Sequence, residues 1–214
     1  MKRILNGTIV LLLAVAIVSA ALTYWYAGTE TREIRAEVIA LADQDLAEVM
    51  MVAETTGNAQ IDDAVHEVIK DCGNRAEYER LLSDLQNLSR ADLLRVADLH
   101  GNCGDYFPTV RSFMAHRLEV ALNRLEAHTR LADSFGANVD GYQVDGWRSL
   151  VAKETARADL LQRQNAIQGQ IIEALVDGRD ADIPDLLNEA QNINGSLNVT
   201  SIQINTEREA LMAS

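Results

Sequence analysis

The sequence predicts an all-α protein in which an amino-terminal transmembrane helix continues into an elongated extracytoplasmic helical bundle. Proline occurs only 2 times in 214 residues and aromatic residues make up 5% of the chain, whereas alanine, leucine, glutamate, glutamine and arginine are plentiful. This composition favours long helices and is a poor one for sheets. A long uncharged segment near the amino terminus predicts the membrane part of the fold.

The uncharged segment runs from Ile4 to Thr29 and contains the apolar stretch TIVLLLAVAIVSAALTYWYA, which covers 20 residues from Thr8 to Ala27. An α-helix rises about 1.5 Å per residue, so this stretch matches the roughly 30 Å hydrocarbon core of a bilayer. We therefore predict a membrane anchor over residues 8–28. The small residues of VSAA leave a cleaved signal peptide as the alternative, although cleavable apolar regions usually run for only about 7 to 15 residues.

The flanking residues predict how this anchor is oriented. Lys2 and Arg3 are the only basic residues before it, and basic residues stay on the cytoplasmic side of a membrane. We expect residues 1–7 in the cytoplasm and everything after residue 28 outside. Interface-anchoring aromatic side chains are expected where the helix leaves the bilayer. Three residues lie there: Tyr24, Trp25 and Tyr26.

The exported chain divides into a helical region, 29–135, a loop, 136–146, and a long helical hairpin, 147–214. In the helical region, apolar residues recur at spacings of three and four, which predicts helices. The first continues the anchor to about Gly57, and the others cover about 61–72, 78–88, 93–103 and 105–135. Two Asp-Gly pairs in GANVDGYQVDGW are strong turn signals and place the loop.

Capping residues indicate the ends of these helices. Gly73 is well placed as a left-handed cap after the second helix, and we expect Gly104, which follows the second cysteine, to be a cap as well. Ser89, followed three residues later by Asp92, matches an amino-terminal cap for the helix that leads to the second cysteine. We expect Asp105 to cap the long helix and Gly136 to end it.

The carboxy-terminal hairpin combines a helix from Trp147 to about Asp177, with the polar middle QRQNAIQGQ, and a helix that begins at DIPD, where Pro184 fits the first turn. The second helix repeats apolar residues at steps of four and three, which is typical of a seam that packs against a partner helix. This seam consists of Leu186, Ala190, Ile193, Leu197, Ile204 and Leu211.

The chain contains 2 cysteines, Cys72 and Cys103, and each ends an apolar helical stripe and precedes a glycine. A hairpin that turns near Ser89 brings them together, and an exported chain meets an oxidising environment, so we predict a disulfide. Closing about 31 residues would stabilise the fold by roughly 3–4 kcal/mol. A metal site that adds His100 to the two thiols is the alternative, but the spacing supplies no fourth ligand.

Charge and motifs narrow the range of functions. The formal net charge of −13 argues against nucleic acid as a partner, because nucleic-acid binding requires a basic surface. The sequence has no nucleophile motif, phosphate loop or dinucleotide fingerprint, and its paired carboxylates are typical of solvated helix faces. We expect no catalysis, no cofactor and no metal.

The cysteine hairpin resembles an uncharacterised bacterial family of short, single-pass envelope proteins with a two-cysteine helical exported domain. The matching residues are Cys72, the stretch RLLSDLQNLSRADL, Cys103, Gly104, Phe107, Met114, Arg117 and Leu118. The resemblance is limited to about residues 70–135. It implies an envelope location and a disulfide, and it brings no activity with it.

These observations predict a membrane-anchored scaffold or protein-interaction module of the cell envelope, which meets a second copy or a partner through amphipathic helices. One alternative is a ligand-sensing helical domain that acts through a membrane partner; a cavity lined by the polar middle between Gln162 and Gln168 would favour it. The other is a pilin-like filament subunit with an assembly helix from Thr8 to Thr56, although Leu12 stands where pilins usually carry glutamate.

Overall fold

The structure is a computed structural model that describes residues 2–43, 59–136 and 143–213. Every regular element in these ranges is a helix, which confirms the predicted all-α class. The elements are α1 (Lys2–Asp43), α3 (Ala59–Asp71), α4 (Arg75–Ser83), the short 3-10 helix η1 (Leu85–Asn87), α5 (Arg90–Cys103), α6 (Tyr106–Ser134), α7 (Val144–Asp177) and α8 (Ile183–Met212). The predicted continuation of the first rod to Gly57 lies outside the described residues.

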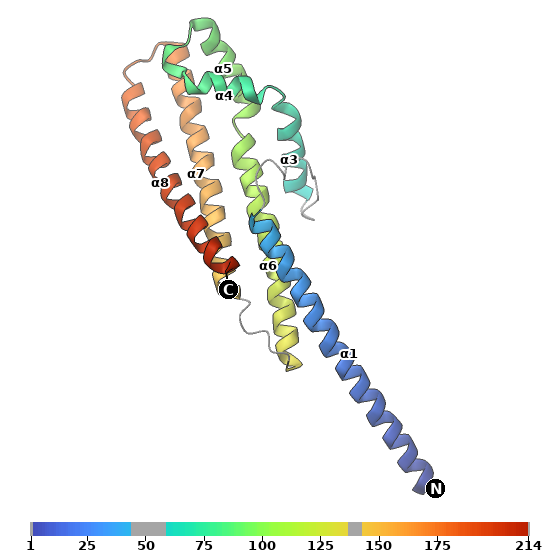
Figure 1. Cartoon of the computed structure of the whole chain (residues 1–214). Coiled ribbons are helices and arrows are strands. Elements are labelled where there is room, and N and C mark those ends of the chain that lie inside the picture. Colours follow the sequence, from blue (N-terminus) through green and yellow to red (C-terminus); the bar gives the residue numbers. More distant parts are fainter. Residues whose placement is uncertain (1, 44–58, 137–142, 214) are drawn as a thin grey trace.

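The long helices form an elongated body. Helix α7 lies between α6 and α8, and α1 packs along the part of α6 that is remote from the short helices (Figure 1). The short helices α3, α4 and α5 gather at the other end of the body and contact α6 and α7 there. We call this end the head.

Two main apolar clusters hold the molecule together. The body cluster joins α1, α6, α7 and α8 and contains Ile34, Val38, Leu118, Ala121, Leu122, Leu125, Trp147, Leu150, Val151, Ile204 and Leu211. The head cluster surrounds the cysteines and contains Cys72, Tyr78, Leu81, Val96, Leu99, Cys103, Tyr106, Val110 and Ile172. Because Ile172 belongs to α7, the head is packed directly onto the body.

Helix α1 contains the predicted membrane anchor. It is continuous over 42 residues, and its amino-terminal part projects away from the other helices (Figure 1). Near its other end, Ile34 and Val38 are buried in the body cluster. Several side chains of the predicted anchor, those of residues 8–14 among them, lie outside the described set. Within the described residues, no helix has a stretch of the length and apolar character that crossing a membrane requires.

Several helix ends follow the predicted caps. The Ser89 hydroxyl accepts a hydrogen bond from the backbone N–H of Asp92 at 3.2 Å, which confirms the cap of α5. Gly136 follows α6 with a φ of 75°, a left-handed conformation that glycine adopts without steric penalty. Gly178 ends α7 in the same way, with a φ of 69°.

Three other capping predictions are wrong. Gly73 and Gly104 are not left-handed, since the only described glycines with positive φ are Gly136 and Gly178. Gly104 stays right-handed helical and donates its N–H to the His100 carbonyl at 2.8 Å, because the chain runs from α5 almost directly into α6. Asp105 precedes α6, but its side chain makes no capping hydrogen bond.

Candidate functional site

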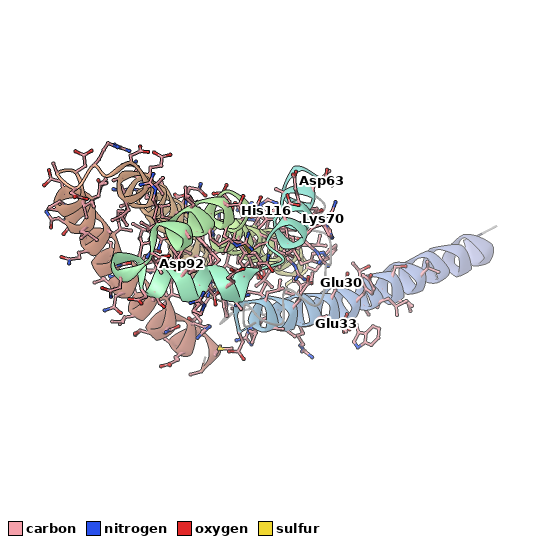
Figure 2. All side chains as sticks on the ribbon, turned by 90° about the horizontal axis from the view of Figure 1, so that it is seen from above. Glu30, Glu33, Asp63, Lys70, Asp92 and His116 are labelled. Carbon is pink, nitrogen blue, oxygen red and sulfur yellow. A yellow bond between two sulfur atoms is a disulfide. The ribbon has the colours of Figure 1, made fainter. Side chains whose placement is uncertain are left out.

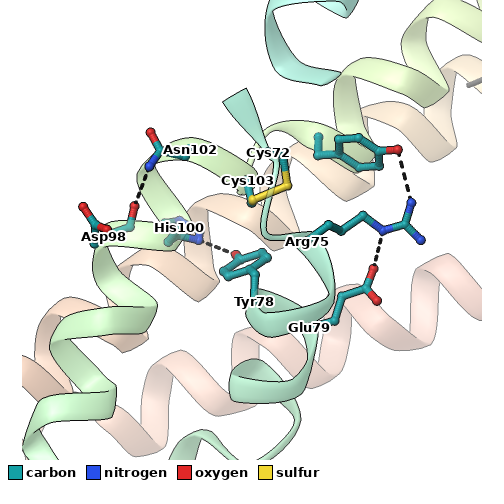
Figure 3. Close-up of a disulfide and its surroundings, with 9 residues drawn as sticks. Cys72, Arg75, Tyr78, Glu79, Asp98, His100, Asn102 and Cys103 are labelled. Carbon is teal, nitrogen blue, oxygen red and sulfur yellow. Dashed lines mark hydrogen bonds and ion pairs between the residues drawn. A yellow bond between two sulfur atoms is a disulfide. The ribbon is translucent and has the colours of Figure 1, made fainter. Parts of the chain in front are cut away.

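The disulfide ties together the two ends of the segment that forms α4 and α5. Cys72 directly follows α3, and Cys103 is the last residue of α5; their sulfur atoms are bonded, with the Cα atoms 4.6 Å apart (Figure 3). Both cysteines are buried in the head cluster. The predicted pairing is confirmed, and the bonded sulfurs leave no thiolates for a metal site with His100.

His100 lies beside the disulfide and links α5 to α4. Its Nδ1 atom lies 2.6 Å from the hydroxyl oxygen of Tyr78, in a hydrogen bond (Figure 3). Burial lowers the pKa of His100, against the opposing effect of the Asp105 and Glu173 carboxylates, and burial raises the pKa of Tyr78. Both side chains are therefore neutral at pH 7, and the junction carries no charge of its own.

Two glycines make the space that His100 occupies. A Cβ atom added to Gly169 of α7 would lie 2.7 Å from His100 Nε2. One added to Gly104 would lie 2.7 Å from the His100 carbonyl oxygen and 2.6 Å from Oδ1 of Asn165. Gly104 therefore serves close approach between the α5–α6 junction and α7, and it does not serve as a left-handed cap.

The polar middle of α7 links this helix to its neighbours. Asn165 donates to Asp105 Oδ1 at 2.8 Å, and Gln162 donates to the same atom at 3.3 Å. On another side of α7, Gln164 donates to Asn194 Oδ1 of α8 at 2.6 Å. These amides donate to Asp105 and Asn194 across helix interfaces, whereas Oδ1 of Asn165 is buried and has no hydrogen-bond partner among the described residues. Gln168 lines a separate pocket between α7, α8 and the segment around Leu85.

The predicted seam of α8 packs against α7 of the same chain. Ile193 forms a cluster with Ile167 and Ile171, and Leu186, Ala190 and Leu197 pack against that cluster. The two remaining residues of the seam, Ile204 and Leu211, are buried in the body cluster. The seam thus packs on a helix of the same chain, with Ile193, Ile204 and Leu211 buried.

The predicted interface aromatics lie on the projecting part of α1. Trp25 is 68% exposed and Tyr26 is 62% exposed, whereas the side chain of Tyr24 lies outside the described residues. Glu30 and Glu33 follow within two turns, where α1 approaches the body (Figure 2). Trp25 and Tyr26 therefore mark the boundary between the apolar and the charged parts of α1.

A cavity of about 380 Å³ lies where α1, α6, α7 and α8 meet. Its apolar lining comes from Leu41, Ala42, Met114, Ala115, Leu118 and Leu150, and its polar lining from Asp43, Arg111, Glu154, Arg157, Asn205 and Arg208. None of these polar residues belongs to a motif or a predicted site. They come from four helices, so no local spacing marks them as a group.

The cavity has a distinctive hydrogen-bond pattern. Arg157 pairs with Glu154 at 2.7 Å, and the two side chains are only 12% and 18% exposed. Arg208 donates to the Ala42 carbonyl at 3.2 Å and to Asn205 Oδ1 at 3.1 Å, both neutral acceptors. The Nε atom of Arg157 is buried and has no acceptor among the described residues. A buried donor without an acceptor costs about 1–3 kcal/mol, so a ligand that accepts from it would recover this free energy.

The described residues offer no arrangement of side chains suited to metal coordination. In the ranges that the structure describes, no three His, Cys, Asp or Glu side chains are grouped so as to hold a metal ion.

Comparisons with protein-family models, with curated proteins and with solved structures find no match to this chain. The resemblance of residues 70–135 to an envelope family stays a prediction.

Proposed function

We propose that this protein is a single-pass envelope protein in which residues 8–28 anchor an extracytoplasmic helical interaction module that performs no catalysis. The amino terminus would lie in the cytoplasm and the bundle outside. The observation that carries the proposal is the two-part character of α1: one end is buried in the body cluster, and the other stands clear of the bundle and is apolar (Figure 1).

The projecting part of α1 exposes large apolar side chains on more than one side. Val15, Val18 and Leu22 follow one another at steps of three and four, and Ile17 points elsewhere on the helix; each is more than half exposed. A helix that is apolar all round is stable in apolar surroundings and unfavourable in water. A bilayer would provide those surroundings, with Trp25 at its surface.

The disulfide supports the placement of the bundle outside the cytoplasm. Disulfides persist in oxidising compartments and are rare in the cytosol, where thiols are kept reduced. The net charge of −13 agrees with a soluble, exposed surface and with a partner other than nucleic acid.

Alkaline carbonate extraction of bacterial membranes that contain the full chain tests the anchor. We expect the protein to stay in the membrane pellet and the Val18→Glu, Leu22→Glu double variant to be released, since two buried carboxylates oppose insertion. Val199→Glu, at a 55% exposed position of α8, is the matched control and should stay in the pellet. Release of the wild-type chain, or retention of the Val18→Glu, Leu22→Glu variant, would contradict the anchor.

The orientation and the partner require two further measurements. A protease added outside spheroplasts should remove a carboxy-terminal tag, whereas a protected tag would reverse the proposed orientation. Affinity purification of the detergent-extracted chain after cross-linking in cells should retain one envelope partner or a second copy. A monomer that cross-links to nothing in the envelope would leave the interaction module without a basis.

Ligand sensing through a membrane partner is the second candidate function. The observation that favours it is the cavity at the end of α1, because the same helix lines the cavity and carries the proposed anchor. The pilin-like alternative has less support, since Leu12 stands where pilins usually carry glutamate.

A further inference from the structure

We propose that the cavity between α1, α6, α7 and α8 binds a small organic carboxylate. The inference rests on the ligand-sensing candidate and gives it a site and a ligand class. It does not depend on the membrane anchor, because every residue of the cavity belongs to the bundle or to its junction with α1.

The cavity gathers cationic side chains. Arg111, Arg157 and Arg208 bring three guanidinium groups to one cavity from three different helices. They do so in a chain whose formal net charge is −13. The Glu154 carboxylate pairs with Arg157, and Asp43 also lines the cavity. Arg208 forms no ion pair with the described carboxylates, so an anion would neutralise its charge.

Two of the arginines have hydrogen-bond donors that a carboxylate could use. Arg208 makes its two hydrogen bonds with neutral acceptors and forms no ion pair with the described carboxylates. Arg157 contributes the buried Nε atom without an acceptor. A carboxylate offers two oxygen atoms whose spacing matches the fork of a guanidinium, so it can accept from Arg208 and still reach a second donor.

The smaller, apolar part of the cavity lining favours an organic anion over a bare inorganic one. Leu41, Ala42 and Met114 stay partly exposed, whereas Leu118 and Leu150 are already buried in the body cluster. A hydrocarbon segment attached to the carboxylate would cover the three partly exposed side chains, whereas phosphate or sulfate would leave them in contact with water. The volume of about 380 Å³ lies within the range of small-molecule sites.

Calorimetric titration of the full chain in detergent micelles tests the site, with succinate and benzoate as organic carboxylates and inorganic phosphate as the bare anion. Asn205→Asp places a carboxylate beside Arg208, keeps the hydrogen bond and neutralises the charge; position 205 is exposed, so folding should be retained. Arg208→Gln is the second variant. Arg163→Gln removes the same charge from an exposed position of α7 that does not line the cavity, and it is the matched control.

We expect at least one of the two carboxylates to bind the wild-type chain more tightly than phosphate does. Both cavity variants should weaken that binding at least tenfold, with melting temperatures that report an intact fold, and Arg163→Gln should bind as the wild type does. The proposal is overturned if neither carboxylate binds, if phosphate binds as tightly, or if Asn205→Asp leaves the affinity unchanged. These outcomes are independent of carbonate extraction, so this site and the membrane anchor can fail separately.

Discussion

His100 lies between Gly104 and Gly169, whose missing side chains leave the space that the imidazole and its backbone fill. The contact joins the end of α5 to the middle of α7, residues far apart in the sequence. A glycine that follows a helical stripe is usually interpreted as a left-handed cap. Here close approach of two helices explains Gly104 instead, and only the tertiary structure could show it.

Gly169→Ala tests this close packing. Alanine normally stabilises a helix interior by about 1 kcal/mol relative to glycine, but the new methyl group would lie 2.7 Å from His100 Nε2. We expect a net loss of about 1–3 kcal/mol in the free energy of unfolding, as in overpacked cores. Gly195→Ala in α8 is the control, since no atom lies within 4 Å of its Cβ. Urea denaturation should show a lower free energy of unfolding for Gly169→Ala and a higher one for Gly195→Ala. An equal gain in stability for both variants would exclude the contact.

The buried His100 also predicts a pH dependence. Burial lowers its pKa below 6.5 in the folded state, so the unfolded chain binds a proton first as the pH falls. Stability is therefore fully present above about pH 6.5 and decreases as the pH falls through the lowered pKa of the folded state. We expect the difference in unfolding free energy between pH 7.5 and pH 5.5 to shrink in His100→Gln. An unchanged difference would mean that His100 does not contribute.

At the scale of the helix, local patterns predicted most boundaries correctly. Ser89 caps α5, Gly136 follows α6, and the helix from Trp147 to Asp177 is confirmed within α7. Such features depend on a few neighbouring residues, so the sequence alone carries them. The predicted hairpin placed α8 beside α7, whereas the repeat of four and three by itself shows that a helix packs and does not show against which helix.

The disulfide is the strongest constraint on the short helices of the head. It links residues separated by 31 positions, and a loop of that length predicts a stabilisation of about 3–4 kcal/mol. Replacing Cys72 and Cys103 by alanine together should lower the urea midpoint accordingly. Reductant added to the wild-type chain should give a similar midpoint. Identical midpoints for the oxidised wild type and the double variant would contradict the constraint.

Two isoleucines on α8 provide a direct test of the intramolecular seam. Ile204 is 1% exposed in the body cluster, and Ile202 is 57% exposed on the same helix. We expect Ile204→Ala to lower the free energy of unfolding by about 2–5 kcal/mol. Ile202→Ala should change it by less than about 0.5 kcal/mol. Similar losses at both positions would mean that α8 is packed differently.

At the scale of the whole molecule, α1 contributes to the bundle only through its last third. Removing residues 1–28 should leave the unfolding free energy nearly unchanged, because Ile34 and Val38 remain in the body cluster. Removing residues 1–43 should cost about 3–6 kcal/mol, since two fully buried apolar side chains are lost. Thermal melts of the two truncated chains in the same buffer check this. A large loss on the shorter truncation would show that the projecting part contacts the bundle.

The cavity is the part of the candidate site that the sequence could not predict. Arg111, Arg157 and Arg208 are far apart in the chain and follow no motif, and each taken alone resembles an ordinary surface residue of a helix. Their convergence depends on how four helices pack side by side. The cysteine pair could be predicted because both cysteines end helical stripes of one hairpin. The predicted export of the chain to an oxidising environment also favours a disulfide.

Because α1 is continuous from Lys2 to Asp43, the rotation of its projecting part about the helix axis is fixed relative to the bundle. Successive residues of an α-helix are rotated by about 100° around its axis. One residue inserted near Gly28 would turn the apolar part of α1 by about 100° relative to the cavity, and seven inserted residues would nearly restore the original direction about 10 Å further away. The number of residues in α1 thus decides which side of the bundle would face a neighbour of the proposed anchor.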